Sequence, residues 1–364
     1  MAQDEVPDRI GRRGFLKVAS LAGTGIFIAS CIPAAVAPTP TPAAKPTATP
    51  APAGAQAPTA APKVSAKIEF ASGGGGIGLQ MLPLLVAQEL FVKDEGITQN
   101  LTSLSGGGDA VRAVVTGGFN LGHVAPSAAA IAADQDQPIV VIAGLLPFSS
   151  IFWIVKADSP LKTVKDLKGK KLGYSRPGSV SDTYARTMLR TVGLKVDTDV
   201  TLVAAGAPAE QLTAVVTGII DAGWCNDPIL TQSLLKKEIR ILGAAYEYVT
   251  SWIEAVYCTT TDYAKANKDV LVAYLRAQQK AMDFIKANPV KAAEIWAKGQ
   301  DIDPEVGMAA VKNYPLDKFT LKIDPVALKA ISSDMLANQQ IKTAPNWGKF
   351  IDQSFLPPEL RSQI

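Results

Sequence analysis

The chain has 364 residues, of which 48% are hydrophobic and 19% charged, and its formal net charge is +3. This length and composition predict a globular protein with a substantial core. The small net charge, with no basic patch interleaved with aromatic residues, argues against nucleic-acid binding. The single histidine, His123, argues against a histidine-rich zinc site and against a Ser-His-Asp hydrolase.

The first residues have the pattern of an export signal. Arg12 and Arg13 form a twin-arginine pair, and a compact apolar run follows from Val18 to Ser30. This run is short for a bilayer span, which needs ~20 residues, and is typical of a signal peptide. It ends in IASC at residues 28–31, which resembles a bacterial lipoprotein box. We expect residues 1–31 to be a signal ending at Cys31, which carries a lipid; a core cysteine beside a chance arginine pair is the alternative.

Residues 32–65 consist mostly of proline, alanine and threonine. They have almost no large apolar side chains, so burial cannot offset the entropy of ordering them. We expect an extended, partly polyproline spacer that reaches roughly 100 Å at most, at ~3.1 Å per residue. Such a segment suits a tether between a lipid anchor and a folded domain.

The next segment, 72-SGGGGIG-78, fits the G-x-G-x-x-G spacing of a dinucleotide-binding turn. A short apolar run precedes it and a helix-like run, Leu79 to Phe91, follows. Such a turn needs an acidic residue at the end of the second strand, but that strand, Thr98 to Leu104, has none, and no GK[ST] motif is present. An exported NAD(P)-binding oxidoreductase remains an alternative, because the twin-arginine route exports folded, cofactor-loaded enzymes.

An internal repeat indicates two similar lobes. The pentapeptide AVVTG starts at residues 113 and 214, an offset of 214 − 113 = 101, and the alignment pairs His123 with Trp224. Upstream, 67-KIEF-70 and 171-KLGY-174 each precede a small-residue loop and a helical run that ends at Gly96 or Gly193, where φ > 0 is expected. Alternating strands and helices predict an α/β fold with mainly parallel sheets.

In an open α/β sheet, ligands bind beyond the carboxyl ends of the strands, against helix N-termini. Six predicted loops occupy such places and consist largely of glycine, serine, proline and alanine, which let backbone amides approach a ligand closely. They are residues 72–78, 105–109 and 124–127 in the first lobe, and 176–182, 204–209 and 225–228 in the second. We expect them to form a binding cleft, although well-capped helices are the alternative for any one loop.

From about Lys67 onward the chain resembles the extracytoplasmic solute-binding proteins of ABC transporters, of the nitrate/sulfonate/taurine/thiamine-precursor type. The resemblance is carried by 79-LQMLPLLVAQELFVKDEGI-97, 113-AVVTGGFNLG-122, 163-TVKDLKGKKLGYSRPGS-179 and 218-GIIDAGWCNDP-228. It implies a type II periplasmic-binding-protein fold, with residues 66–155 and 256–364 as lobe one and 156–255 as lobe two. The crossover segments are expected near 151–160 and 254–262, and residues 264–289 as a helix with apolar residues at helical spacing.

The cleft loops and the aromatic residues near them supply the candidate site. The candidate ligand-binding residues are Gly75, Gly76, Ile77, Gln80, Ser105, Gly106, Gly107, His123, Pro126, Ser127, Trp153, Arg176, Gly178, Ser179, Ser181, Trp224, Asn226 and Asp227. Backbone amides at helix N-termini favour a small organic anion, such as a sulfonate or carboxylate, and a neutral or zwitterionic heterocycle is the second class. No catalytic residue, metal ligand or cofactor is predicted.

Trp224 suits stacking on a planar ligand or closing over an aliphatic one, and Trp153 is a second candidate wall. His123 suits donation to an anion, with pH-sensitive binding, and Arg176 suits a carboxylate or sulfonate. Asp227 suits an amine or ring N–H. The alternatives are core packing, a satisfied structural histidine, a solvated arginine and a helix cap.

The resemblance implies a monomer, anchored by a lipid at Cys31 to the outer face of the cell membrane or free in the periplasm, that captures a small-molecule solute for an ABC permease. A ligand-presenting sensor of the same fold is an alternative. An enzyme of thiamine-pyrimidine synthesis is another, although that chemistry needs a His- and Cys-rich site. Whether Cys225 and Cys258 form a disulfide is left open.

Overall fold

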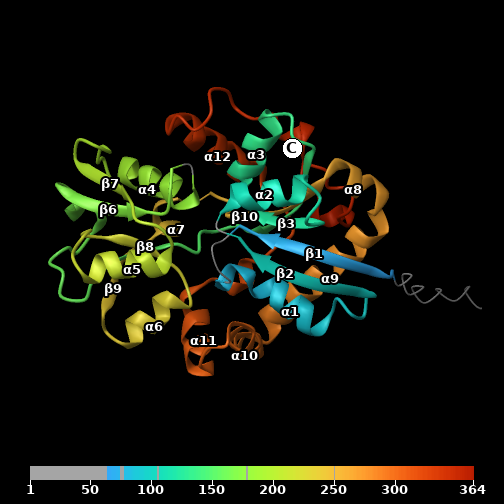
Figure 1. Cartoon of the computed structure of the whole chain (residues 1–364), viewed down its shortest axis with the longest axis horizontal. Helices are drawn as coiled ribbons and strands as arrows, with labels where there is room; N and C mark the ends of the chain where they lie inside the picture. The colour runs from blue at the N-terminus through green and yellow to red at the C-terminus, as the bar shows by residue number, and fades with distance from the viewer. Residues whose placement is uncertain (1–63, 74–77, 105, 178, 250) are drawn as a thin grey trace, which may run out of the picture. The chain divides into compact units, whose positions relative to one another are not determined.

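A computed structural model describes residues 64–364 apart from 74–77, 105, 178 and 250 (Figure 1). The predicted signal, Cys31 and nearly all of the predicted tether lie outside the described residues. Residues Ala60–Ile364 form one compact unit. Within the described part of this unit, no helix is long and apolar enough to cross a membrane.

The first lobe is built on a five-stranded sheet of order β2-β1-β3-β10-β4. Its strands are β1 (Ala66–Ser72), β2 (Ile97–Ser103), β3 (Leu121–Val124), β4 (Ile139–Leu146) and β10 (Ala255–Thr260). Strand β1 is parallel to β2 and β3, whereas β10 is antiparallel to both β3 and β4.

Helices cover both faces of this sheet (Figure 1). The earlier ones are α1 (Leu82–Leu90), α2 (Gly107–Val115) and α3 (Pro126–Asp134), and the C-terminal part adds α8 (Thr261–Ala266), α9 (Lys268–Ala287), α10 (Pro289–Gln300), α11 (Pro304–Ala310) and α12 (Pro325–Ala337). Helix α9 accounts for most of the helix predicted over 264–289, and Leu271, Tyr274 and Ile285 form its buried stripe. Residues 264–266 instead belong to α8, and Pro289 starts α10.

The second lobe repeats the plan. Its strands are β5 (Phe152–Lys156), β6 (Lys170–Tyr174), β7 (Val200–Ala204), β8 (Gly223–Cys225) and β9 (Ile239–Ala244), and its helices are α4 (Val180–Thr191), α5 (Pro208–Val216), α6 (Ile229–Leu235) and α7 (Ala245–Tyr248). Strand β5 is antiparallel to β8 and β9, β6 is parallel to β7, and a parallel bridge from Leu172 to Ala222 joins the two groups. The resulting order, β7-β6-β8-β5-β9, matches that of the first lobe.

The sheets are mainly parallel, as expected, with one antiparallel strand in each: β10 in the first lobe and β5 in the second. Strand β4 runs in the same direction as β1 to β3, and the chain then crosses to the other lobe and starts β5 at the near end of that sheet. Strand β5 therefore runs against its neighbours, and β10 does the same on the return. The predicted boundary between the lobes, at residue 155, falls inside strand β5. Because Phe152–Lys156 pairs with β8 and β9, this strand belongs to the sheet of the second lobe.

The internal repeat corresponds to equivalent structure. Asn120 and Asp221 occupy the same place: the Asn120 side chain accepts the Glu69 amide at 2.8 Å, and the Asp221 side chain accepts the Lys171 amide at 2.9 Å. Gly96 and Gly193 both have φ of +80°. Gly193 directly follows the C-cap of α4, as expected for a residue that ends a helix, whereas Gly96 closes the turn between α1 and β2, because α1 already ends at Leu90. The repeat therefore records two lobes with the same local hydrogen-bond plan.

The two crossovers contact each other and the C-terminal part of the chain. The Glu254 amide donates to the Leu146 carbonyl at 2.8 Å. Tyr314 packs on Phe148 and Phe152 at ring-centroid distances of 6.5 and 5.5 Å, and its hydroxyl donates to the Ser150 carbonyl at 3.4 Å. A residue far along the chain thus fixes the junction between the lobes.

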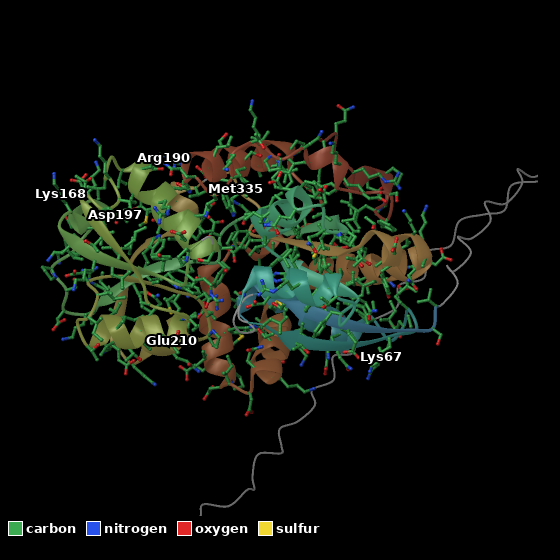
Figure 2. The ribbon with its side chains drawn as sticks, turned by 45° about the horizontal axis from the view of Figure 1, so that its top comes forward. Lys67, Lys168, Arg190, Asp197, Glu210 and Met335 are labelled. Atoms are coloured by element: carbon green, nitrogen blue, oxygen red, sulfur yellow. The ribbon has the colours of Figure 1, made fainter. Side chains whose placement is uncertain are left out.

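Helix α12 also contacts the second lobe. Arg190 of α4 forms an ion pair with Asp334 of α12, and Thr183 exchanges hydrogen bonds with Gln340. Figure 2 shows Arg190 and Met335 at this junction. The contacts join the lobes on the side opposite α6 and α11.

A buried ion pair attaches α9 to the segment before β2. Glu95 is 5% exposed and accepts hydrogen bonds from Arg276 and Lys280, and the Arg276 hydrogen bond is the main reason why the pKa of Glu95 falls to about 2. We expect Glu95→Gln to lower the free energy of unfolding at pH 7 by about 2 kcal/mol. This is less than the loss of a fully buried pair, because both cations are partly exposed.

The sign of the pH dependence follows from the lowered pKa of Glu95. The stabilisation is present above the unfolded pKa near 4.5 and is lost as the pH falls toward about 2. Urea unfolding of wild type and Glu95→Gln at pH 7 and pH 3 should therefore show a difference that shrinks in acid. Glu89→Gln, which removes an exposed pair with Lys298, should cost less than about 0.5 kcal/mol; equal losses for both variants would contradict the prediction.

Candidate functional site

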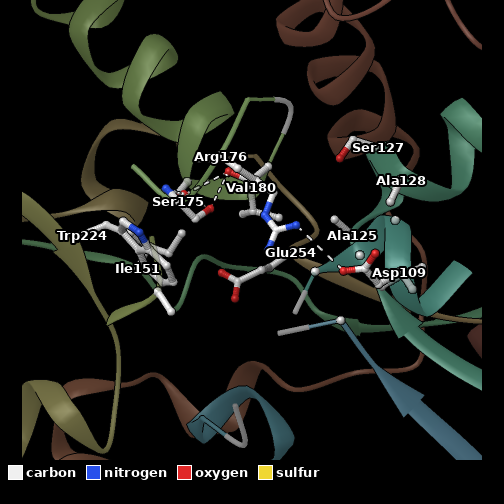
Figure 3. Close-up of a pocket in the computed structure, with 18 of the residues that line it drawn as sticks. Asp109, Ala125, Ser127, Ala128, Ile151, Ser175, Arg176, Val180, Trp224 and Glu254 are labelled. Carbon is white, nitrogen blue, oxygen red and sulfur yellow. Dashed lines mark hydrogen bonds and ion pairs between the residues drawn. The ribbon is translucent and has the colours of Figure 1, made fainter. Parts of the chain in front are cut away.

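A cavity of about 600 Å³ lies between the two lobes (Figure 3). All six loops predicted from the sequence contribute to its lining, from Gly73 in the first to Asn226 in the last, and both crossovers add residues. These loops meet because β1, β3, β6 and β8 all end toward the same space. The volume is in the range of sites for small organic molecules.

The structure brings together ten of the candidate residues at this cavity. They are Gln80, Gly106, Gly107, His123, Ser127, Arg176, Ser179, Ser181, Trp224 and Asn226. Pro126, Trp153 and Asp227 do not line it. Gly75, Gly76, Ile77, Ser105 and Gly178 lie outside the described residues.

The three candidates away from the cavity lining have structural positions. Trp153 is fully buried in β5, directly opposite Trp224 on β8. Asp227 is 1% exposed, and its Oδ1 accepts the Thr231 amide in α6 at 2.9 Å. Pro126 is the first residue of α3. The Asp227 side chain thus accepts a hydrogen bond from the first turn of α6, although the N-cap residue of this helix is Pro228.

The glycines that open the first loop have packing reasons. A Cβ on Gly73 would lie 2.6 Å from the Gly107 Cα, and a Cβ on Gly78 would lie 2.2 Å from the Gln80 Oε1. Side chains at these positions would push apart two loops that line the cavity. Close packing between β1 and the start of α2 therefore accounts for Gly73 without a dinucleotide.

Three serine hydroxyls form a cluster at the start of α4. The Ser175 Oγ lies 2.8 Å from both the Ser179 Oγ and the Ser181 Oγ, and those two lie 3.0 Å apart. Ser179 is also the N-cap of α4, since its Oγ accepts the Asp182 amide at 3.2 Å. All three serines line the cavity, which places adaptable donors beside the positive end of a helix.

Asp109 pairs with one arginine on its own helix and with a second arginine across the cavity. Asp109, in the first turn of α2, pairs with Arg112 on its own helix and has Oδ2 at 3.9 Å from the Arg176 Nη1 of the second lobe. Figure 3 shows Arg176 reaching from the second lobe toward Asp109. The cavity therefore has a bridging ion pair between its two walls, which reasoning from sequence did not assign.

Glu254, from the second crossover, was also missed. It is 9% exposed, and Ser150 of the first crossover donates to its carboxylate through both the backbone amide and the hydroxyl. Burial outweighs these hydrogen bonds and raises the pKa of Glu254 to about 7. The signal available in the sequence was a single acidic residue within the apolar stretch 252-WIEAVYC-258. Acidic residues are rarely buried without a partner, so such a residue indicates a specific role.

His123 is neutral near pH 7. It is 5% exposed, and burial lowers its pKa to about 4, so its protonation does not make binding pH-sensitive near neutrality. Its Nδ1 lies 3.4 Å from the Ser72 Oγ, and that hydroxyl donates to the Met81 Sδ at 3.3 Å. His123 Nε2 is buried and has no hydrogen-bond partner among the described residues.

The described part of the chain contains neither a disulfide nor a cluster of metal-binding side chains. Cys225 and Cys258 are both free and buried. Burial raises the pKa of both thiols, that of Cys258 to about 12. No group of three or more His, Cys, Asp or Glu side chains in the described residues is arranged to hold a metal ion.

Two α/β lobes, two crossovers and a cavity at the strand ends define the periplasmic-binding-protein fold. The alkanesulfonate-binding protein SsuA from Xanthomonas axonopodis pv. citri bound to MOPS has this fold with a TM-score of 0.67 at 16% identity, over 83% of this chain and 100% of that chain. The chain belongs to the NMT1/THI5-like family, which matches residues 79–292. The resemblance and the fold predicted from the sequence are thus confirmed.

Two curated relatives show the breadth of the family. The 4-amino-5-hydroxymethyl-2-methylpyrimidine phosphate synthase THI5 of Saccharomyces cerevisiae is 24% identical over 240 residues, 62% of this chain and 68% of the relative. The taurine-binding periplasmic protein of Escherichia coli is 28% identical over 225 residues, 59% of this chain and 66% of the relative. Similar sequences thus carry the names of both an enzyme and a binding protein.

Proposed function

We propose that this protein captures a small organic solute between its lobes, outside the cytoplasmic membrane, and delivers it to an ABC permease. The observation that carries the proposal is the cavity of about 600 Å³, which is lined by loops of both lobes and by both crossovers. A solute in this position touches both lobes at once, so interactions that form as the lobes close would favour the closed form. The similarity to a taurine-binding protein supports the proposal.

The serine cluster and Arg176 support a solute with an anionic group, such as a sulfonate or carboxylate. Ser175, Ser179 and Ser181 present hydroxyls at the N-terminus of α4. The Arg176 side chain is 57% exposed and lines the same space. These groups donate hydrogen bonds or carry positive charge, which is the chemistry that anions require.

Binding rather than catalysis is the proposed role, even though some relatives are named synthases. Among the described residues that line the cavity, His123 is the single histidine and no cysteine is present. A synthase site rich in histidine and cysteine would need more such groups here. A sensor of the same fold would share this cavity, and genomic neighbours would distinguish it: a permease and ATPase favour uptake, and a kinase or cyclase favours sensing.

The proposed location rests on the sequence. Arg12 and Arg13 would direct export, Cys31 would carry a lipid, and residues 32–65 would tether the unit to the outer face of the membrane. The proposed working form is a monomer, because both lobes of the cavity come from one chain.

Ligand binding should raise the melting temperature of the unit Ala60–Ile364 and reduce its radius of gyration, because a bridging solute draws the lobes together. A thermal-shift screen of sulfonates, carboxylates, pyrimidines and NAD(P), followed by small-angle X-ray scattering with each hit, measures both. A saturating ligand that left both quantities unchanged would count against capture by closure. Stabilisation by NAD(P) alone would favour the oxidoreductase alternative.

A further inference from the structure

Glu254 is a buried acid at the junction of the two lobes and lines the cavity. Its two carboxylate oxygens each accept a hydrogen bond, one from the Ser150 amide and the other from the Ser150 hydroxyl. A carboxylate has about four acceptor positions, so lone pairs remain for a further donor. In Figure 3 the carboxylate lies between Trp224 and Ile151 on one side and Arg176 and Asp109 on the other.

No cation among the described residues compensates this carboxylate. None of the ion pairs between these residues includes Glu254. The two arginines that line the cavity, Arg112 and Arg176, both pair with Asp109. An ionised acid buried without a partner is costly, so its place in a ligand cavity indicates that the missing charge belongs to the ligand.

Besides Asp109 and Glu254, the acidic residue among the described ones that lines the cavity is Glu210, and its carboxylate is already hydrogen-bonded. Glu210 accepts the Ala207 amide at 2.6 Å and so caps α5. With Asp109 shared by two arginines and Glu210 used at a helix start, Glu254 is the acid available to a solute. Gln80 Oε1 and His123 Nε2, both on residues that line the cavity, are further buried polar atoms with no partner in the described part of the chain.

We propose that Glu254 binds a positively charged or hydrogen-bond-donating nitrogen of the solute, so that the solute class is an amine or amino-substituted heterocycle rather than a simple anion. The inference rests on the proposed function and deepens it. The serine cluster at α4 takes the anionic end, and Glu254 takes the nitrogen end. Because Ser150 and Glu254 come from different crossovers, the nitrogen is bound at the junction of the two lobes.

The first test uses pairs of probes that differ at one group. We would compare 2-aminoethanesulfonate with 2-hydroxyethanesulfonate, 3-aminopropanoate with propanoate, and 4-aminopyrimidine with 4-methylpyrimidine, by thermal shift and calorimetry on the unit Ala60–Ile364. Stabilisation should be confined to the member of at least one pair that carries the amino group. Glu254→Gln should weaken that binding by about 30-fold or more, while Glu238→Gln, the same charge change at an exposed position away from the cavity, should leave it unchanged.

The outcomes separate the two proposals. If a nitrogen-free anion binds as well as its amine counterpart, and does so equally in Glu254→Gln, the role of Glu254 is overturned and solute capture stands. If no probe binds, and native mass spectrometry after incubation with a low-molecular-weight cell extract shows no bound solute, solute capture fails as well. Preserved amine binding in a folded Glu254→Gln variant also overturns the role of Glu254.

A second readout distinguishes recognition from a structural role. Burial raises the pKa of Glu254 to about 7, so the apo fold is more stable with this carboxyl protonated than with it ionised. This stability is fully present below pH 4.5 and is lost as the pH rises through 7. Glu254→Gln should therefore raise the apo melting temperature at pH 8. Wild-type affinity for an amine probe should fall on acidification below pH 7, and that of Glu254→Gln should not. The nearby Tyr184 and Tyr314 stay neutral throughout, because burial raises the pKa of both well above 10.

Discussion

Replacing Gly173 by alanine should lower the free energy of unfolding by about 3 kcal/mol. Gly173 lies in β6, where a Cβ would come within 2.1 Å of the Gln211 Oε1 and 2.5 Å of the Ile220 Cδ1. Gln211 is fully buried, and its Nε2 donates to the Tyr174 carbonyl at 2.9 Å and to the Gly206 carbonyl at 3.1 Å. A methyl group would displace this side chain, and each of the two carbonyls would lose one of its donors.

The same substitution should also weaken ligand binding. Gly206 belongs to a loop that lines the cavity, and its carbonyl also accepts the Trp224 Nε1 at 3.2 Å. Gln211 thus holds the loop and the indole ring in one arrangement. A displaced Gln211 would leave the loop free to move, so binding would have to order it at an entropic cost.

Urea unfolding and calorimetry measure the two effects of Gly173→Ala. The matched control is Gly118→Ala, because the nearest atom to a Cβ there is the Ala113 carbonyl oxygen at 3.5 Å, an ordinary contact. That variant should remain within about 0.5 kcal/mol of wild type. A Gly173→Ala protein as stable as Gly118→Ala would show that β6 and α5 can separate, and would contradict the predicted clash.

Local sequence patterns predicted the features that depend on neighbours in the chain. The repeated AVVTG segments lie at the ends of α2 and α5, and Gly96 and Gly193 both have the positive φ expected from the sequence. The long apolar stripe of α9 was visible for the same reason. The loops around the cavity were predicted because parallel strands in one sheet end at the same edge.

Features that depend on pairing between distant segments were not predicted. Glu254 and Ser150 are 104 residues apart, and only the meeting of the two crossovers joins them. Asp109 and Arg176 likewise come from different lobes. The direction of β5 and β10 depends on where the chain enters each sheet, which no local pattern contains.

The two tryptophans show the same limit. Trp153 and Trp224 lie directly opposite each other on antiparallel strands, so their side chains share one face of the sheet. Trp224 lines the cavity, whereas Trp153 is fully buried and does not. From composition and spacing, both tryptophans are predicted to line the cavity. Only the packing around them shows that Trp224 lines it and that Trp153 lies in the core.

Trp224→Ala should weaken binding of the solute by about 10- to 100-fold, because it removes a large apolar wall that the ligand would contact. Trp224→Phe should lose less, since a ring remains, but it removes the donor to the Gly206 carbonyl. Trp153→Phe should lower stability with little change in affinity, because Trp153 does not line the cavity. Affinities by calorimetry and unfolding free energies by urea, measured on the same variants, provide the comparison.

The comparison between neighbouring tryptophans distinguishes contact from general weakening of the lobe. If Trp224 acts through contact, its two variants lose affinity out of proportion to their loss of stability, and Trp153→Phe shows the reverse. If affinity falls in step with stability in all three variants, Trp224 supports the lobe and the solute is bound by other walls of the cavity. Since a lost contact is expected mainly as faster dissociation, stopped-flow release of the solute would give the same answer from rates alone.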